Sequence, residues 1–223
     1  MARPRASMSP SGETSSRRAV PWSSFPAPCA GVDEAGRGCL AGPVVAAAAV
    51  FAPAFDFSQL PGLDDSKQVR EADRLRLAGE IRRHSLAWAV GFAWPREIEA
   101  VNILQATLRA MRRAVDRLAV RPVFLVIDGN QLLPECPIAQ QALVDGDALT
   151  PGIAAASILA KTTRDRVMQA LDLRFPGYGF ASHKGYGCAA HKAAIRALGP
   201  CLQHRMTFRG VRPEEEQARL PGL

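Results

Sequence analysis

The stretch Gly31-Val32-Asp33-Glu34-Ala35-Gly36-Arg37-Gly38 places two adjacent carboxylates directly before an arginine flanked by glycines. Apolar residues precede it from Cys29, and a run of Val and Ala follows from Pro43 to Phe51. This pattern predicts a buried strand, a tight glycine turn and a second buried strand. Burying unpaired carboxylates is costly, so the pair needs cations, hydrogen bonds or water. A divalent metal would satisfy both Asp33 and Glu34.

An exposed turn is the alternative explanation, because Asp-Glu pairs are common in turns and Gly-x-Gly alone is a weak signal for phosphate binding. The consensus Gly-x-x-x-x-Gly-Lys-Ser/Thr is absent from the sequence, which excludes a P-loop. Gly36-Arg37-Gly38 also lacks the third glycine of a dinucleotide-binding fingerprint. The choice between a metal site and a turn therefore depends on the rest of the chain.

Length and composition indicate one main globular domain. The chain has 223 residues, 48% of them hydrophobic. No apolar run approaches the ~18 residues that span a bilayer, and the start lacks the apolar core of a secretory signal, so we expect a cytoplasmic protein. The cysteines are odd in number and include no Cys-x-x-Cys pair, which argues against a disulfide framework and a zinc ribbon; they are Cys29, Cys39, Cys136, Cys188 and Cys201.

The formal net charge of +7 is compatible with a polyanionic partner such as nucleic acid. Part of it belongs to residues 1–28, which are rich in Ser, Pro and Arg and poor in apolar periodicity. Such a composition does not repay the entropy of ordering. We therefore predict a disordered basic N-terminal extension over 1–28, outside the fold.

Hydrophobic periodicity predicts alternating helices and strands after the first two strands. One long helix is expected to begin at Pro95 and to run through Leu118, because apolar residues recur there at steps of three or four. The other expected helices are Glu71 to His84, Pro151 to Phe175 and Ala189 to Leu198, and the other expected strands are Leu86 to Trp94, Pro122 to Ile127 and Ala142 to Val144.

Further carboxylates follow the later strands, in Asp128-Gly129-Asn130 and Asp145-Gly146-Asp147. Ligands bind at the carboxyl ends of strands in open α/β sheets, although Asp-Gly-Asn is also an ordinary turn. A cluster of hard oxygen ligands favours Mg²⁺ or Mn²⁺ over zinc. One tension is that neighbours in a regular strand point to opposite faces, so Asp33 and Glu34 share a site only where the strand ends or distorts.

Two loops have alternative explanations. Asp65-Ser66-Lys67 offers a hydroxyl and a point charge for a phosphate, or a helix N-cap. The aromatic loop from Phe175 to Phe180, followed by Ser182-His183-Lys184-Gly185-Tyr186-Gly187, suits either base and sugar stacking or a small satellite core.

Taken together, these segments resemble the ribonuclease HII family, the type 2 ribonucleases H. The resemblance spans about Gly31 to Phe208, in the family's order, and is carried by Gly31 to Gly38, Asp65-Ser66-Lys67, Asp128-Gly129-Asn130, Ala154 to Lys161 with Arg164-Asp165, and His183-Lys184-Gly185-Tyr186. It implies a ribonuclease H-like α/β fold, with a central mixed five-stranded sheet flanked by helices and a small helical C-terminal part. The catalytic domain would cover 29–210, with a C-terminal tail over 211–223.

The resemblance also implies endonucleolytic cleavage of RNA in RNA–DNA hybrids, and of single ribonucleotides embedded in duplex DNA, on the 5′ side of the ribonucleotide. Two Mn²⁺ or Mg²⁺ ions would be held by Asp33, Glu34, Asp128 and Asp147. The fourth ligand is where the sequence departs from the family, whose members usually have Lys-Gly-Asp in place of Asp145-Gly146-Asp147. Residues implied to bind substrate are Gly36, Arg37, Gly38, Ser66, Lys67, Lys184 and Tyr186.

Within that set, the Gly36-Arg37-Gly38 backbone and Tyr186 would sense the ribose 2′-hydroxyl, while Arg37 and Lys67 approach phosphates. Two other functions are alternatives: a non-catalytic nucleic-acid-binding module and a Mg²⁺-dependent phosphotransferase acting on small molecules. No apolar stripe is left unassigned, so a monomer is expected.

Overall fold

The computed structural model describes residues 19–63 and 69–212. Helices and strands alternate along the chain, and none of the described helices is long and apolar enough to span a membrane. In chain order the elements are η1 (Trp22–Ser24), β1 (Cys29–Ala35), β2 (Val44–Phe51), η2 (Phe57–Gln59), α1 (Glu71–His84), β3 (Ala87–Ala93), α2 (Pro95–Val101), α3 (Ile103–Asp116), β4 (Phe124–Asp128), β5 (Ala139–Leu143), α4 (Gly146–Leu149), α5 (Pro151–Arg174), α6 (Phe180–His183) and α7 (Ala189–Leu198).

The strands form one mixed five-stranded sheet in the order β3-β2-β1-β4-β5, as the resemblance implied. β2 pairs antiparallel with β1 and β3, whereas β1, β4 and β5 run parallel. Every residue of β2 is buried, which fits a strand covered on both faces. The ladder between β1 and β4 ends at the pair Val32–Ile127, so Asp33 lies one residue beyond it.

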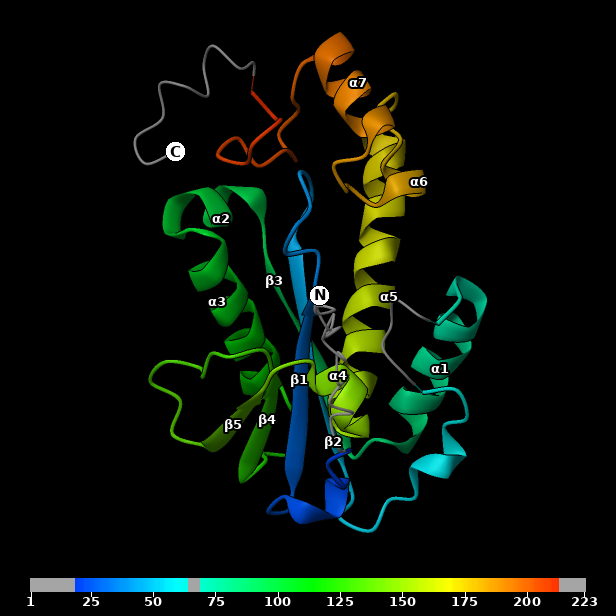
Figure 1. Ribbon diagram of the computed structural model, residues 1–223, viewed down its shortest axis with the longest axis vertical. Coiled ribbons are helices and arrows are strands. Elements are labelled where there is room, and N and C mark those ends of the chain that lie inside the picture. The colour runs from blue at the N-terminus through cyan, green and yellow to red at the C-terminus, as the bar shows by residue number, and fades with distance from the viewer. Residues whose placement is uncertain (1–18, 64–68, 213–223) are drawn as a thin grey trace, which may run out of the picture.

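Helices cover both faces of the sheet, with α2 and α3 on one side and α1 and α5 on the other (Figure 1). Glycine allows α5 to approach β1 very closely, because a Cβ added at Gly31 would lie 2.1 Å from the Gly152 carbonyl oxygen. This close packing carries Ser157 of α5 to the side chain of Asp33.

The long helix predicted from Pro95 to Leu118 is wrong in one respect, because the structure has two helices there. Asn102 separates α2 from α3 with a left-handed φ of 70°, and its side chain accepts a hydrogen bond from the Gln105 amide at 3.0 Å. With a ψ of 167° this backbone conformation is rare outside glycine, and the Asn102 side chain caps the new helix. The longest helix is α5, with 24 residues.

The packed part of the chain begins before residue 29. Trp22, 6% exposed, and Phe25 belong to the core on the α5 side of the sheet. A Cβ added at Gly152 would lie only 1.9 Å from the nearest atom of the Trp22 ring. The boundary predicted at residue 28 is therefore too late, while residues 1–18 and 213–223 lie outside the described residues.

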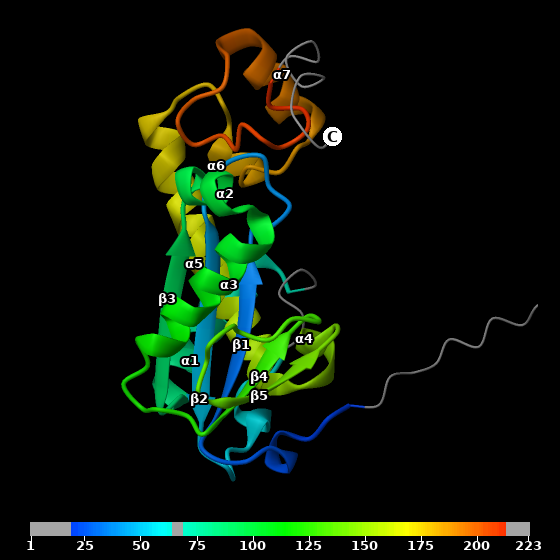
Figure 2. The same ribbon diagram turned by 90° about the vertical axis from the view of Figure 1, so that its left-hand side faces the viewer.

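The C-terminal part packs at one end of α5, beside the loop that joins β1 to β2 (Figure 2). Tyr178 and Phe180 are buried in a small cluster there with Ala41, Met168 and Leu171. Of the two explanations for the aromatic loop, a satellite core is therefore correct for Tyr178 and Phe180. Tyr186 differs from them, because it remains exposed.

Candidate active site

Asp33 is a core residue, 4% exposed, near the end of β1. The Ser157 hydroxyl of α5 is hydrogen-bonded to its carboxylate. The amide of Glu34 donates to Asp33 Oδ1 at 2.6 Å. These contacts fix the orientation of the carboxylate.

The electrostatic setting of Asp33 disfavours its negative charge. Burial raises the pKa of Asp33 well above its usual range, and the neighbouring carboxylates of Glu34 and Asp128 raise it further. The hydrogen bonds from Ser157 and from the Glu34 amide act in the opposite direction, and are weaker. A divalent cation beside Asp33 would offset both the cost of burying its charge and the repulsion from the neighbouring carboxylates.

Asp128 and Asp147 belong to the segment that runs from β4 to α4. Asp128 ends β4, and its Oδ1 accepts a hydrogen bond from the Gly146 amide at 2.8 Å, which ties the end of β4 to the start of α4. Asp147 lies in α4 and its Oδ1 accepts from the Ala148 amide at 3.0 Å. Asp145 precedes this helix in a left-handed conformation, with φ of 56°.

Two of the other candidate metal ligands act directly on Asp33. The carboxylates of Glu34 and Asp128 both raise its pKa. Within residues 19–63 and 69–212, no three His, Cys, Asp or Glu side chains are arranged to hold a metal ion by themselves. The all-oxygen donor set suits Mg²⁺ or Mn²⁺, and Mg²⁺ in phosphate-processing sites typically keeps waters and substrate oxygens beside one or two carboxylates.

The glycine turn presents exposed backbone next to this site. Gly36 has a φ of 90°, and Arg37 and Gly38 are exposed. The Arg37 guanidinium lies 4.0 Å from the Glu34 carboxylate. On the inner side, two buried arginines, Arg164 and Arg205, bond to backbone carbonyls of residues 36–43.

Tyr186 lies beside the same loop and is 44% exposed. The Lys161 ammonium and the Arg164 guanidinium lie 5.9 Å and 6.0 Å from its ring centre. Its hydroxyl is hydrogen-bonded to the sulfur of buried Cys39. The structure therefore brings Tyr186, Arg37 and Gly38 to one surface.

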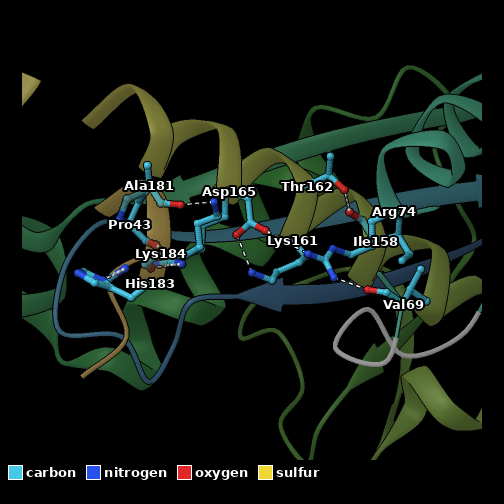
Figure 3. A network of polar contacts seen from close by, with 12 residues as sticks. Pro43, Val69, Arg74, Ile158, Lys161, Thr162, Asp165, Ala181, His183 and Lys184 are labelled. Carbon is cyan, nitrogen blue, oxygen red and sulfur yellow. Dashed lines mark hydrogen bonds and ion pairs between the residues drawn. The ribbon is translucent and has the colours of Figure 1, made fainter. Parts of the chain in front are cut away.

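A cationic network continues along α5 toward α1 (Figure 3). Asp165 accepts from Lys161 at 2.6 Å and lies 3.6 Å from the Arg74 guanidinium of α1. All three side chains are largely buried. Asp165 thus holds two cations in place, and the three side chains together keep one net positive charge.

The remaining predicted substrate-binding residues are less defined. The Lys184 ammonium donates to the Ala181 carbonyl at 2.5 Å, so its charge is directed back to α6 (Figure 3). Ser66 and Lys67 lie outside the described residues. The sequence analysis assigns no role to Ser157, Arg164 or Arg205. Arginine normally indicates an exposed surface, and a serine within a helix of small residues has no distinctive pattern.

Comparison with known proteins adds an independent criterion. The family model of ribonuclease HII matches residues 30–211. This chain belongs to the ribonuclease HII family. A ribonuclease HII of Nitratidesulfovibrio vulgaris is 52% identical over 217 residues, covering 92% of this chain and 97% of that protein.

Solved structures agree with the fold. The ribonuclease H2 of Pyrococcus horikoshii aligns with a TM-score of 0.70 and 26% identity, covering 86% of this chain and 99% of that one. The ribonuclease HII of Archaeoglobus fulgidus, solved in complex with PCNA, aligns with a TM-score of 0.68 and 27% identity, covering 83% and 96%. The resemblance in the sequence is confirmed at the level of family and fold.

Family membership also decides between the functions weighed from the sequence. A ribonuclease HII is an endonuclease that hydrolyses RNA in RNA–DNA hybrids and at ribonucleotides embedded in DNA. The non-catalytic binding module and the small-molecule phosphotransferase are therefore set aside.

Proposed function

We propose that this ribonuclease HII cleaves the phosphodiester on the 5′ side of a ribonucleotide, leaving a 3′-hydroxyl and a 5′-phosphate, at a site built from Asp33, Glu34, Asp128 and Asp147. The observation that supports this most is the position of Asp33, where burial and the neighbouring carboxylates of Glu34 and Asp128 raise its pKa well above its usual range. A purely structural aspartate in the core would instead be paired with a base.

Divalent ions, Mg²⁺ or Mn²⁺, would activate a water and stabilise the leaving oxygen when bound to these carboxylates. The chain itself supplies the alignment of its ligands. Ser157 and the Glu34 amide orient Asp33, and the Gly146 amide orients Asp128. Because the ligands are fixed before substrate arrives, less reorganisation is needed in the transition state.

Recognition of the ribonucleotide is assigned to Arg37, Gly38 and Tyr186. Only the 2′-hydroxyl distinguishes RNA from DNA at one position, and exposed backbone amides in a glycine turn can reach a sugar closely. The Tyr186 ring offers a stacking surface whose neighbours, Lys161 and Arg164, add positive charge.

The direct test uses one DNA duplex with a single embedded ribonucleotide, incubated with Mg²⁺ or with EDTA. Asp128→Asn keeps the size of the side chain and the acceptor for the Gly146 amide, but removes a negative charge. It should abolish cleavage while duplex binding stays equal or tightens. Asp116→Asn, an exposed aspartate paired with Arg112, is the matched control and should cleave normally. Near wild-type turnover by Asp128→Asn would refute the assignment.

Tyr186→Ala tests recognition separately from chemistry. Stacking contributes ~1–3 kcal/mol per base in single-strand binders, and a loss of that size in the transition state slows cleavage roughly tenfold to a hundredfold. The embedded ribonucleotide should be slowed more than an all-RNA hybrid strand, which offers many cleavage registers. Equal slowing of both substrates would mean that Tyr186 serves general binding or folding.

A further inference from the structure

The dipeptide His204-Arg205 is buried although both side chains are polar, with exposures of 2% and 0%. It follows α7 and lies against the loop between β1 and β2. The Arg205 amide donates to the Leu40 carbonyl at 2.8 Å, and the Gly42 amide donates to the Gln203 carbonyl at 2.8 Å. These backbone bonds bring the two side chains between the glycine turn and Tyr186.

Arg205 binds the glycine turn from the inside. Its guanidinium donates to the carbonyls of Gly36 and Arg37, each at 2.7 Å, and to the Gly42 carbonyl at 2.9 and 3.1 Å. Within the part of the chain that the structure describes, no carboxylate pairs with it. A buried cation held only by carbonyls is costly, and burial lowers the pKa of Arg205 to about 10.

These bonds determine which way the turn presents its amides. In a planar trans peptide the carbonyl and the N–H point in opposite directions. Anchoring the Gly36 and Arg37 carbonyls to Arg205 therefore turns the N–H groups of Arg37 and Gly38 away from the core. Both residues are exposed, and among the described residues nothing accepts a hydrogen bond from either amide.

His204 reaches the other recognition element through a second histidine. The Cys201 amide donates to His204 Nδ1 at 2.9 Å, so His204 carries its proton on Nε2. His204 Nε2 lies 3.1 Å from His191 Nε2, which must then accept. His191 consequently has its proton on Nδ1 and donates to the Tyr186 carbonyl at 2.9 Å. The chain of bonds is complete only when both rings are neutral.

From these contacts we propose that His204-Arg205 is a positioning element that holds both halves of the ribonucleotide sensor, Arg205 fixing the amides of Arg37 and Gly38 while His204, through His191, fixes Tyr186. This inference rests on the proposed recognition function. Neither residue touches the substrate, and each acts through the backbone of a residue that does.

The test compares selectivity rather than activity alone. Arg205→Lys keeps the charge but has no planar fork to bind several carbonyls at once. His204→Phe keeps the ring and removes both hydrogen bonds, whereas His204→Gln restores a donor at the position of Nε2. We expect Arg205→Lys and His204→Phe to lower kcat/KM for the embedded ribonucleotide about tenfold relative to the hybrid strand, the effect of one misaligned hydrogen bond. His204→Gln should recover part of the lost kcat/KM.

Arg113→Lys is the matched control, because Arg113 also binds a backbone carbonyl, that of Phe92, but lies outside the site. It should lower thermal stability without changing the ratio between the two substrates. All variants are assayed well below their melting temperatures, with Tyr186→Ala run beside them. If Tyr186→Ala changes the ratio while Arg205→Lys and His204→Phe do not, the positioning proposal is overturned and the proposed function stands.

A measurement on the wild-type protein tests the proposal even if the variants do not fold. With ¹⁵N-labelled histidines, NMR should show His204 protonated on Nε2 and His191 protonated on Nδ1 at neutral pH. The opposite tautomers, or a charged ring, would overturn the relay to Tyr186. If Tyr186→Ala leaves the ratio unchanged, the recognition function fails instead, and the proposal is then decided by the tautomers and by whether Arg205→Lys shifts the amide signals of Arg37 and Gly38.

Discussion

The surroundings of Asp33 oppose its negative charge, through burial and through the carboxylates of Glu34 and Asp128. The hydrogen bond from Ser157 favours a carboxylate at this position, but it does not offset the effects of burial and of the two like charges. Function and stability should therefore conflict at Asp33, as they do at many active sites.

Asp33→Asn should abolish cleavage and, in EDTA, raise the melting temperature, because it removes a buried charge next to two like charges. A gain of 1 kcal/mol corresponds to ~2–4 °C for a protein of this size. Adding Mg²⁺ should raise the melting temperature of the wild type more than that of Asp33→Asn. Calorimetry with and without Mg²⁺ checks this, and a lower melting temperature of the variant in EDTA would contradict it.

The two glycines of the recognition turn should respond differently to alanine. A Cβ at Gly38 meets nothing within 4 Å, so Gly38→Ala should leave stability unchanged but slow cleavage about tenfold, by occupying space that only substrate uses. A Cβ at Gly36 would lie 1.8 Å from Arg164 Nε at a φ of 90°, so Gly36→Ala should destabilise the fold. Melting curves and single-turnover rates separate the two effects; an unstable Gly38→Ala would show that its methyl faces the protein.

At the scale of elements, α7 is joined to the segment after it by the pair His191 and His204. Burial lowers the pKa of both imidazoles, that of His204 to about 4, with further lowering from the neighbouring histidines. His183 stacks on His191 with ring centres 4.3 Å apart. This end of the molecule consequently folds with uncharged histidines.

The pair should make the protein less stable in mild acid. Between pH ~6.5, where unfolded histidine titrates, and about 4, the folded value of His204, the unfolded chain binds a proton that folded His204 does not, so stability falls as pH falls. The slope is about 1.4 kcal/mol per pH unit for each such histidine. Asp33 acts in the opposite direction, because its raised pKa makes the folded state take up a proton.

Denaturant unfolding at several pH values isolates the contribution of His204 as the difference between the wild type and His204→Phe. That difference in the free energy of unfolding should decrease as the pH falls from ~6.5 to about 4. A difference that is independent of pH would mean that His204 titrates alike in both states.

At the scale of the whole molecule, the start of the chain has two parts with different roles. Residues 1–18 carry Arg3, Arg5, Arg17, Arg18 and Glu13, a net charge of +3. Residues 19–28 contribute Trp22 and Phe25 to the core, and the Pro28 carbonyl accepts from the Val123 amide at 2.8 Å.

Deleting residues 1–18 should leave the melting temperature nearly unchanged and weaken the salt dependence of duplex binding, because fewer counterions are released. Deleting residues 1–28 should lower the melting temperature by ~10 °C or more, since losing a buried aromatic side chain costs ~3–5 kcal/mol. Trp22→Ala in the full chain should reproduce much of the thermal loss with an unchanged salt dependence. Equal melting temperatures for both deletions would contradict the packing of Trp22.

Much of this protein follows from local sequence. The run from Val44 to Phe51, the apolar end of β4 and the periodicity of α1 and α7 each define an element with little help from elsewhere, because period and residue type suffice. The motif around Asp33 and its order relative to Asp128 and Lys161 also indicate the family. The break at Asn102 was missed because an apolar stripe continues through it and only backbone geometry interrupts it.

The tertiary structure alone decided what the buried polar residues do. Nothing local to Arg205 indicates that it binds carbonyls 168 and 169 residues earlier in the chain, or that His204 reaches Tyr186 through His191. Such roles depend on which groups are buried side by side in the folded protein. A buried donor needs a hydrogen-bond acceptor, and that acceptor can come from any part of the chain. Local residue patterns indicate the chemistry of this ribonuclease HII, whereas contacts between distant segments position its recognition surface.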